Sequence, residues 1–186
     1  MEILTRLPRA LARSALLLPL LLALALAPAT ACAAEGETIE YAVKGAYLYK
    51  FGLYIEWPSG TFAAPASPLV LCVVGDDPFG AALDAAVNGE HVDSHPLQLR
   101  RLKTLTREAG CHVAYLGGAE APREPLRGVL TVSETRGGGV ISFALKDNRV
   151  RFNVDDEAAA RNGLLISSKL LNMALSVKPR AGKEGR

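Results

Sequence analysis

The segment from Thr38 to Pro58 limits most strongly what this chain can fold into. It holds four of the five tyrosines, one of the five phenylalanines and the only tryptophan. If the segment is helical, an advance of about 100° per residue gives the helix two opposite apolar sides. One side carries Ile39, Ala42, Val43, Ala46, Leu53, Tyr54 and Trp57, and the other carries Leu48, Phe51 and Ile55.

A helix that is apolar on two sides needs two surfaces to pack against. We expect the rest of the domain to supply one of them, and core packing is the main interpretation of the aromatic side chains. Tyrosine and tryptophan are also enriched at binding surfaces. The second interpretation is therefore a self or partner interface near Tyr47, Phe51 and Tyr54.

The first residues of the chain have the layout of a secretory signal peptide. Three arginines precede a leucine-rich run from Ala15 to Ala27, and small residues follow it. This order is typical of a segment that is removed on export, so the sequence predicts a signal peptide over residues 1–33 and a periplasmic protein. A retained membrane anchor and a lipoprotein attached through Cys32 are the alternatives.

The net charge and the length of the exported part indicate which partners and how many domains to expect. Without residues 1–33 the chain keeps 18 basic and 18 acidic side chains, so its formal net charge is zero. This balance gives no reason to expect nucleic acid or an anionic membrane surface as a partner. The remaining length suits one domain, which we place over residues 34–178, followed by a polar tail over 179–186.

Two cysteines, Cys72 and Cys111, remain after the signal segment. An even number of thiols in an exported chain predicts a disulfide, with two buried free thiols as the alternative. Two thiols alone do not favour a zinc site.

Strand and helix patterns alternate along the mature chain. Short apolar runs predict strands at 69–74, 111–116 and 128–132, and the polar run at 97–102 predicts an exposed strand. Asp77 and Pro78 are typical of a helix start, for a helix over 78–87. Alternating residues around Lys146-Asp147-Asn148 predict a hairpin over 140–154. A short helix capped by Asp155 and a last helix over 166–177 follow.

This order predicts an α/β fold. We expect a single-domain sandwich around a mixed sheet, flanked by helices, with a C-terminal β-hairpin followed by helices.

Three groups of residues have side chains that could form a chemical site. His91, Asp93 and His95 have a spacing that suits a metal, but no third strong ligand lies nearby in sequence. The turn from Gly75 to Gly80 follows a strand, yet it carries two carboxylates and no lysine, which disfavours phosphate. Ser133-Glu134 and Ser167-Ser168-Lys169 lack the surrounding motif of a nucleophile. We expect no enzyme, no catalytic residue, no metal and no cofactor.

Near its start, the mature chain contains Lys44-Gly45-Ala46-Tyr47-Leu48-Tyr49-Lys50-Phe51, followed by Trp57-Pro58. In these and in later stretches it resembles the YfiR family of small exported proteins, whose members carry a K-A-A-Y-L-Y-x-F-x-x-x-x-x-W-P pattern near the mature start. Lys44 to Phe51 and Trp57-Pro58 fit this pattern except at Gly45, which replaces the usual alanine and costs a helix interior about 1 kcal/mol. Further similar stretches are Cys72 to Gly80, Cys111-His112, Gly138 to Phe143, Asp147 to Phe152 and Gly163 to Leu171.

The resemblance implies a function. It implies a non-enzymatic periplasmic homodimer that inhibits an inner-membrane diguanylate cyclase by binding its sensor region, which lowers cyclic di-GMP and biofilm formation. An outer-membrane lipoprotein is implied as a second partner, and Cys72 and Cys111 match the family's common disulfide. A second cysteine pair of the best-known member is absent, since Phe143 and Phe152 occupy that region.

Three alternatives remain open at this point. In the first alternative, the protein regulates another membrane sensor, such as a histidine kinase, in place of a cyclase. In the second, it is a small-molecule-binding module with a cleft near Gly75 to Gly80. A secreted hydrolase has the least support from the sequence.

Overall fold

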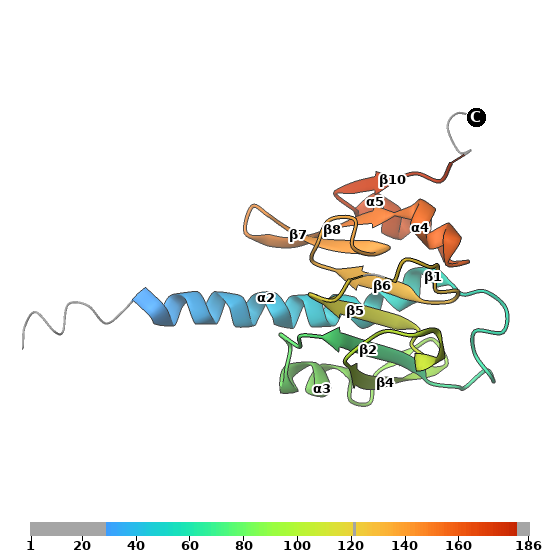
Figure 1. The fold of residues 1–186 in the computed structure, drawn as a ribbon. Helices are drawn as coiled ribbons and strands as arrows, with labels where there is room; N and C mark the ends of the chain where they lie inside the picture. Colours follow the sequence, from blue (N-terminus) through green and yellow to red (C-terminus); the bar gives the residue numbers. More distant parts are fainter. Residues whose placement is uncertain (1–28, 121, 182–186) are drawn as a thin grey trace, which may run out of the picture. The chain divides into compact units, whose positions relative to one another are not determined.

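The computed structural model describes residues 29–120 and 122–181 (Figure 1). The chain divides into two units, Met1–Ile39 and Glu40–Arg186. The first helix, α2 (Ala29–Phe51), runs across this boundary, and the part from Glu40 onward belongs to the second unit. Most of the signal-peptide segment 1–33 lies outside the described residues, so it remains a prediction. Among the residues described, no helix is long and apolar enough to cross a membrane.

The second unit is built around a mixed sheet. Within the described residues this sheet has eight strands in the order β10 (Ser176–Lys178), β8 (Arg149–Asp155), β7 (Ile141–Lys146), β6 (Leu130–Ser133), β5 (Val113–Gly117), β2 (Leu69–Gly75), β4 (His95–Leu102) and β3 (His91–Val92). The remaining elements are the 3-10 turns η1 (Gly52–Tyr54) and η2 (Arg107–Ala109), the helices α3 (Ala81–Val87), α4 (Asp156–Arg161) and α5 (Ser168–Met173), and the small sheet of β1 (Ile55–Glu56) and β9 (Leu165–Ile166).

Most neighbouring strands of the large sheet run parallel. β2 is parallel to β4 on one side and to β5 on the other, and β5, β6 and β7 continue in the same direction. The pairs β7–β8 and β3–β4 are antiparallel, whereas β10 runs parallel to β8 at the edge. The predicted α/β fold with a mixed sheet is thus confirmed.

The central strand β2 is buried on both faces, as its continuous apolar sequence predicts. Leu69, Leu71 and Val73 point into the larger core cluster, which also contains Leu48 and Phe51 of α2. Figure 1 shows this part of α2 running along one face of the sheet, behind β5 and β6. The alternate residues of β2 point into a smaller cluster on the other face, where side chains of the segments around β5 and β6 cover them.

The predicted hairpin is confirmed in its register. Phe143 pairs with Phe152, and Lys146 pairs with Arg149, which leaves Asp147 and Asn148 as the turn. Their φ angles of 51° and 56° are those of a two-residue hairpin turn of type I′. Asp155 caps α4 as predicted, because its carboxylate accepts a hydrogen bond from the Ala158 amide at 2.7 Å.

The prediction of one helix over 166–177 is wrong in part. Ser167 does cap a helix, α5, but that helix ends at Met173. The Leu175 amide then donates to the Phe152 carbonyl at 2.8 Å, and β10 begins alongside β8. Pairing with a distant strand has therefore overridden the local helical pattern. The strand predicted over 97–102 is longer than expected, because β4 begins at His95, and the short strand β3 precedes it.

Two helix boundaries lie several residues from the nearest proline. α2 ends at Phe51, before Trp57-Pro58, because Ile55 and Glu56 pair with β9 as strand β1. Asp77 is not the N-cap of α3; Gly80 holds that position. The Asp77 carboxylate instead accepts hydrogen bonds from the amides of Phe79 and Gly80, at 2.8 and 3.1 Å, in the turn before the helix.

Candidate functional site

The part of α2 that belongs to the second unit has one buried and one exposed apolar side. Leu48 and Phe51 are 0% and 1% exposed, and Ile55, just beyond the helix, is 8% exposed. On the other side, Val43 and Leu53 are 40% and 49% exposed. The sequence therefore assigned these residues to the correct sides. The exposed side has no covering element among the described residues.

The three residues named as an interface lie mostly inside the domain. Phe51 belongs to the core, where its ring meets Phe152 at 5.1 Å between centroids. Tyr47 stacks on Phe51 at 5.6 Å and also packs against the core. Tyr54 is partly buried, and its carbonyl accepts a hydrogen bond from the Ser167 amide. Phe51 is therefore enclosed in the core, whereas Val43 of α2 and Leu53 of η1 are exposed.

A buried lysine connects α2 to the end of β6. The Lys44 ammonium lies 2.5 Å from the Glu40 carboxylate and 3.0 Å from that of Glu134, and the lysine side chain is only 4% exposed. The Tyr115 hydroxyl donates a hydrogen bond of 2.6 Å to the same oxygen of Glu134. The Lys44 nitrogen also lies 4.4 Å from the centre of the Tyr41 ring, within range of a cation–π interaction.

The surroundings set the charge states of these groups. Burial alone would lower the pKa of Lys44, but its hydrogen bonds to Glu40 and Glu134 raise that pKa above the ordinary value. Burial, and then the hydrogen bond to the Glu134 carboxylate, raise the pKa of the Tyr115 hydroxyl far above its usual range. Lys44 is therefore a charged clamp with two carboxylate partners, and Tyr115 stays a neutral donor.

The turn Gly75 to Gly80 lies at the point where the strand order reverses, between β2 and β5. In α/β folds this crevice is the usual place for a ligand. Here the main chain fills it, because the Asp76 amide donates to the Gly117 carbonyl at 2.9 Å. A Cβ atom on Gly117 would lie 1.8 Å from the Asp76 carbonyl oxygen, so only glycine fits. The cleft considered for a small molecule at this turn is therefore occupied by the backbone.

One arginine holds both carboxylates near this turn. The Arg101 guanidinium lies 2.7 Å from Asp77 and 2.7 Å from Asp84 of α3. Burial would raise the pKa of Asp77, but the hydrogen bond from Arg101 and those from two amides lower it below its ordinary value. The cluster joins β4 to α3.

The structure joins Cys72 and Cys111 in a disulfide, with Cα atoms 5.8 Å apart. Cys72 lies in the middle of β2, and Cys111 shortly precedes β5. Both are buried in the smaller core cluster. The bond therefore closes across the two central strands of the sheet, and it suits an oxidising compartment.

The two histidines considered as metal ligands contact main-chain carbonyls: Nδ1 of His91 lies 3.1 Å from the Gly89 oxygen, and Nδ1 of His95 lies 2.6 Å from the Ser67 oxygen. His95 stacks on Phe62 at 3.8 Å, and His112 stacks on the opposite face of that ring at 4.6 Å. The Val70 amide donates to Nδ1 of His112 at 2.9 Å, and burial lowers the pKa of this imidazole. Across residues 29–120 and 122–181, no group of three or more histidine, cysteine or acidic side chains is placed to hold a metal ion.

The serines considered as nucleophiles have structural contacts. The Ser133 hydroxyl donates to the Thr135 carbonyl at 2.8 Å, and the Ser167 hydroxyl accepts from the Leu170 amide at 3.4 Å. Glu134 is engaged by Lys44 and Tyr115 and contacts neither serine in these bonds.

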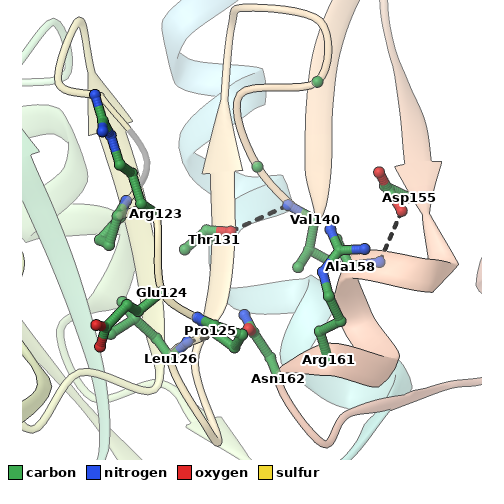
Figure 2. A pocket seen from close by; sticks show the side chains of 13 residues that line it. Arg123, Glu124, Pro125, Leu126, Thr131, Val140, Asp155, Ala158, Arg161 and Asn162 are labelled. Carbon is green, nitrogen blue, oxygen red and sulfur yellow. Dashed lines mark hydrogen bonds between the residues drawn. The ribbon is translucent and has the colours of Figure 1, made fainter.

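A pocket that the sequence did not indicate lies elsewhere, with a volume of about 210 Å³. Figure 2 shows the pocket between the 123–126 segment on one side and α4 on the other, with Thr131 of β6 between them. Arg123 and Arg161 line it together with Asn162, whose amide group donates to the Val129 carbonyl at 2.8 Å.

Sequence reasoning missed the Lys44 clamp and this pocket for different reasons. Glu40 and Lys44 have the i,i+4 spacing of a helical ion pair, which was a usable signal. Glu134 and Tyr115 come from distant strands, and only the folded sheet brings them to the helix. The pocket residues come from several separate segments and share no local pattern.

Comparison with known protein families gives a match over most of the chain. Residues 41–175 match the family described as YfiR/HmsC-like. No curated protein matches the chain. The matched range contains Lys44 and Glu134, both cysteines of the disulfide and every strand of the large sheet except β10. The chain therefore belongs to the YfiR/HmsC-like family.

Proposed function

We propose that this protein is a periplasmic, non-enzymatic regulator that binds the sensor region of an inner-membrane diguanylate cyclase and holds the enzyme in its inactive state. The family membership over residues 41–175 is the observation that carries this proposal. The buried disulfide supports the compartment, because such bonds persist in the periplasm.

The structure supplies a surface that suits such a partner. Val43 and Leu53 are large apolar side chains exposed on α2 and on η1, immediately after it. Beneath them, the Lys44 clamp and the Phe51 contacts fix this segment on the sheet. A rigid apolar surface of this kind loses little conformational entropy on binding. We place the contact with the sensor region here, in preference to Tyr47 and Phe51.

Deleting the gene and measuring cyclic di-GMP tests the regulatory role. The level should rise in the deletion strain and return when the wild-type gene is restored. An unchanged level would remove the cyclase as the target, and a sensor kinase would then be the partner to test.

Complementation with surface variants tests the proposed contact. Leu53→Glu should fail to restore the low cyclic di-GMP level, because it places a charge in an apolar interface. Leu145→Glu is the matched control, since Leu145 is 58% exposed in β7 and belongs to neither α2 nor η1. If both variants restore repression equally, the contact lies elsewhere.

A small-molecule-binding module is the second candidate, and the pocket beside Arg123 and Arg161 favours it. Its volume of about 210 Å³ is below the range of about 300–1,000 Å³ usual for drug-sized ligands, so only a small metabolite would fit. A thermal-shift screen with metabolites tests this candidate, since a ligand that binds only the folded state must raise the melting temperature. Arg161→Ala should abolish any shift that arises at this pocket.

The same screen separates the two functions. A regulator that acts only through a protein partner should show no metabolite-dependent shift, while its deletion still changes cyclic di-GMP. Homodimerisation and capture by an outer-membrane lipoprotein remain proposals that follow from the family.

A further inference from the structure

Strand β4 presents unused main-chain hydrogen-bonding groups along its outer edge. Its inner edge pairs with β2 from Leu97 to Leu102, but β3 covers only His95 and Pro96 on the outer side. The Leu97 amide donates outward to the Glu90 carbonyl at 2.9 Å. Alternate residues of a strand present their N–H and C=O groups to the same side. Leu99 and Arg101 therefore present theirs outward as well, and no described strand pairs with them.

A groove of about 540 Å³ runs between this edge and α3. Figure 1 shows α3 and β4 next to each other at the lower end of the sheet. Leu97 and Leu99 of β4 line the groove together with Ala85 and Val87 of α3. Leu97 and Leu99 are only half-buried, so the groove offers apolar surface that the domain itself does not cover. A free strand edge beside such a groove is the arrangement that binds extended peptides by strand addition.

The charges at the groove favour a basic segment. Asp84 lines the groove and shares the single guanidinium of Arg101 with Asp77. Two carboxylates with one guanidinium leave one negative charge at this end. Sheet edges are commonly protected by free charged side chains. Arg101 does not serve in this way, because Asp77 and Asp84 hold its side chain toward α3.

We propose that the outer edge of β4 binds an extended, basic segment of a protein partner as an additional strand. The segment's main chain pairs with Leu99 and Arg101, an apolar side chain enters the groove over Leu97 and Leu99, and a lysine or arginine lies beside Asp84. This recognition is separate from the contact on α2, so its failure leaves the regulatory function intact.

The probe for this site is a short capped peptide of alternating lysine and valine, titrated into the isotope-labelled protein. Amide signals of Leu99 and Arg101 should shift, and these amides should become protected from hydrogen exchange. The same peptide with N-methylated valines keeps its side chains but loses main-chain donors, and it should not bind. A glutamate–valine peptide should bind more weakly, because Asp84 repels it.

Asp84→Asn should weaken binding of the lysine–valine peptide by roughly two- to fivefold, the range of an exposed charge pair. Glu108→Gln is the matched control, because it removes one exposed carboxylate in η2, outside the groove, and should leave the affinity unchanged. The proposal is overturned if the lysine and glutamate peptides bind equally, or if the shifts map to other strands. Protection of Leu99 and Arg101 that rises with protein concentration alone would also overturn it, since a second copy would then occupy the edge.

Discussion

Replacing Lys44 by methionine isolates the contribution of the buried ammonium. Methionine keeps an unbranched side chain of similar length, so packing against Tyr41 and Phe143 is largely retained. What disappears is the positive charge between Glu40 and Glu134. Both carboxylates then lose their cation, and Glu134 keeps only the hydrogen bond from Tyr115.

The solvent exposure of Glu40 and Glu134 determines how much unfolding free energy the Lys44→Met variant loses. Removing one member of a fully buried ion pair costs about 3–5 kcal/mol. The side chains of Glu40 and Glu134 are 23% and 37% exposed, so water can partly replace the ammonium. The expected loss in unfolding free energy is therefore smaller, about 2–3 kcal/mol. For a domain of this size, that loss corresponds to a fall in melting temperature of roughly 4–12 °C.

Urea unfolding followed by the fluorescence of Trp57 measures this difference, with far-UV circular dichroism as the second probe. Lys178→Met is the matched control, because Lys178 also lies between two carboxylates, Asp155 and Glu157, but is 58% exposed. Its replacement should change the midpoint little, as is usual for surface pairs. If the Lys44 variant unfolds at the same midpoint as the Lys178 variant, the clamp does not stabilise the fold as argued.

Three further changes test other parts of the structure. Mass spectrometry without reductant should show the intact disulfide, and two free thiols would contradict the pairing. The double substitution Cys72→Ala and Cys111→Ala should lower the unfolding free energy by about 4 kcal/mol, because the bond closes a loop of 39 residues. Gly45→Ala should raise the unfolding free energy by up to about 1 kcal/mol through helix propensity. The new methyl group meets the flexible end of Leu83 at 3.3 Å and the Phe79 ring at an ordinary contact distance of 3.6 Å. A lower midpoint would show that Leu83 cannot yield. Burial lowers the pKa of His112, so the unfolded chain takes up the proton more readily, and stability should fall as pH drops below the unfolded value of about 6.5. His112→Gln should flatten that dependence, and equal pH profiles would exclude His112 as its source.

The parts of the fold that the sequence predicted are those that short-range patterns determine. The hairpin over 140–154 follows from alternation around a two-residue turn, and β2 follows from an unbroken apolar run. The two apolar sides of α2 follow from helical periodicity, and the burial of Leu48 and the exposure of Val43 agree with it. Each of these depends on residues within a few positions of one another.

The errors arise where distant segments compete with local preference. Val177 continues a helical pattern, but it pairs with Val154 in β10 instead. Core packing was the main interpretation for Phe51, but its core partners Phe143 and Phe152 lie far away in the sequence and could not be named from it. Glu134 gave no signal as a partner of Lys44, because the two lie far apart in the chain. Periodicity identifies which side chains share a face, and only the tertiary fold determines what covers that face.

The disulfide also determines which parts of the sheet can open without global unfolding. It ties β2 to the segment that leads into β5, so the middle of the sheet cannot separate while the bond is intact. The amides of β2 and β5 should therefore exchange only when the whole domain unfolds. The outer strands β3 and β10 are short and paired on one side, and they can detach in local openings of low free energy. Structural adjustment to a partner is thus confined to the two margins of the sheet.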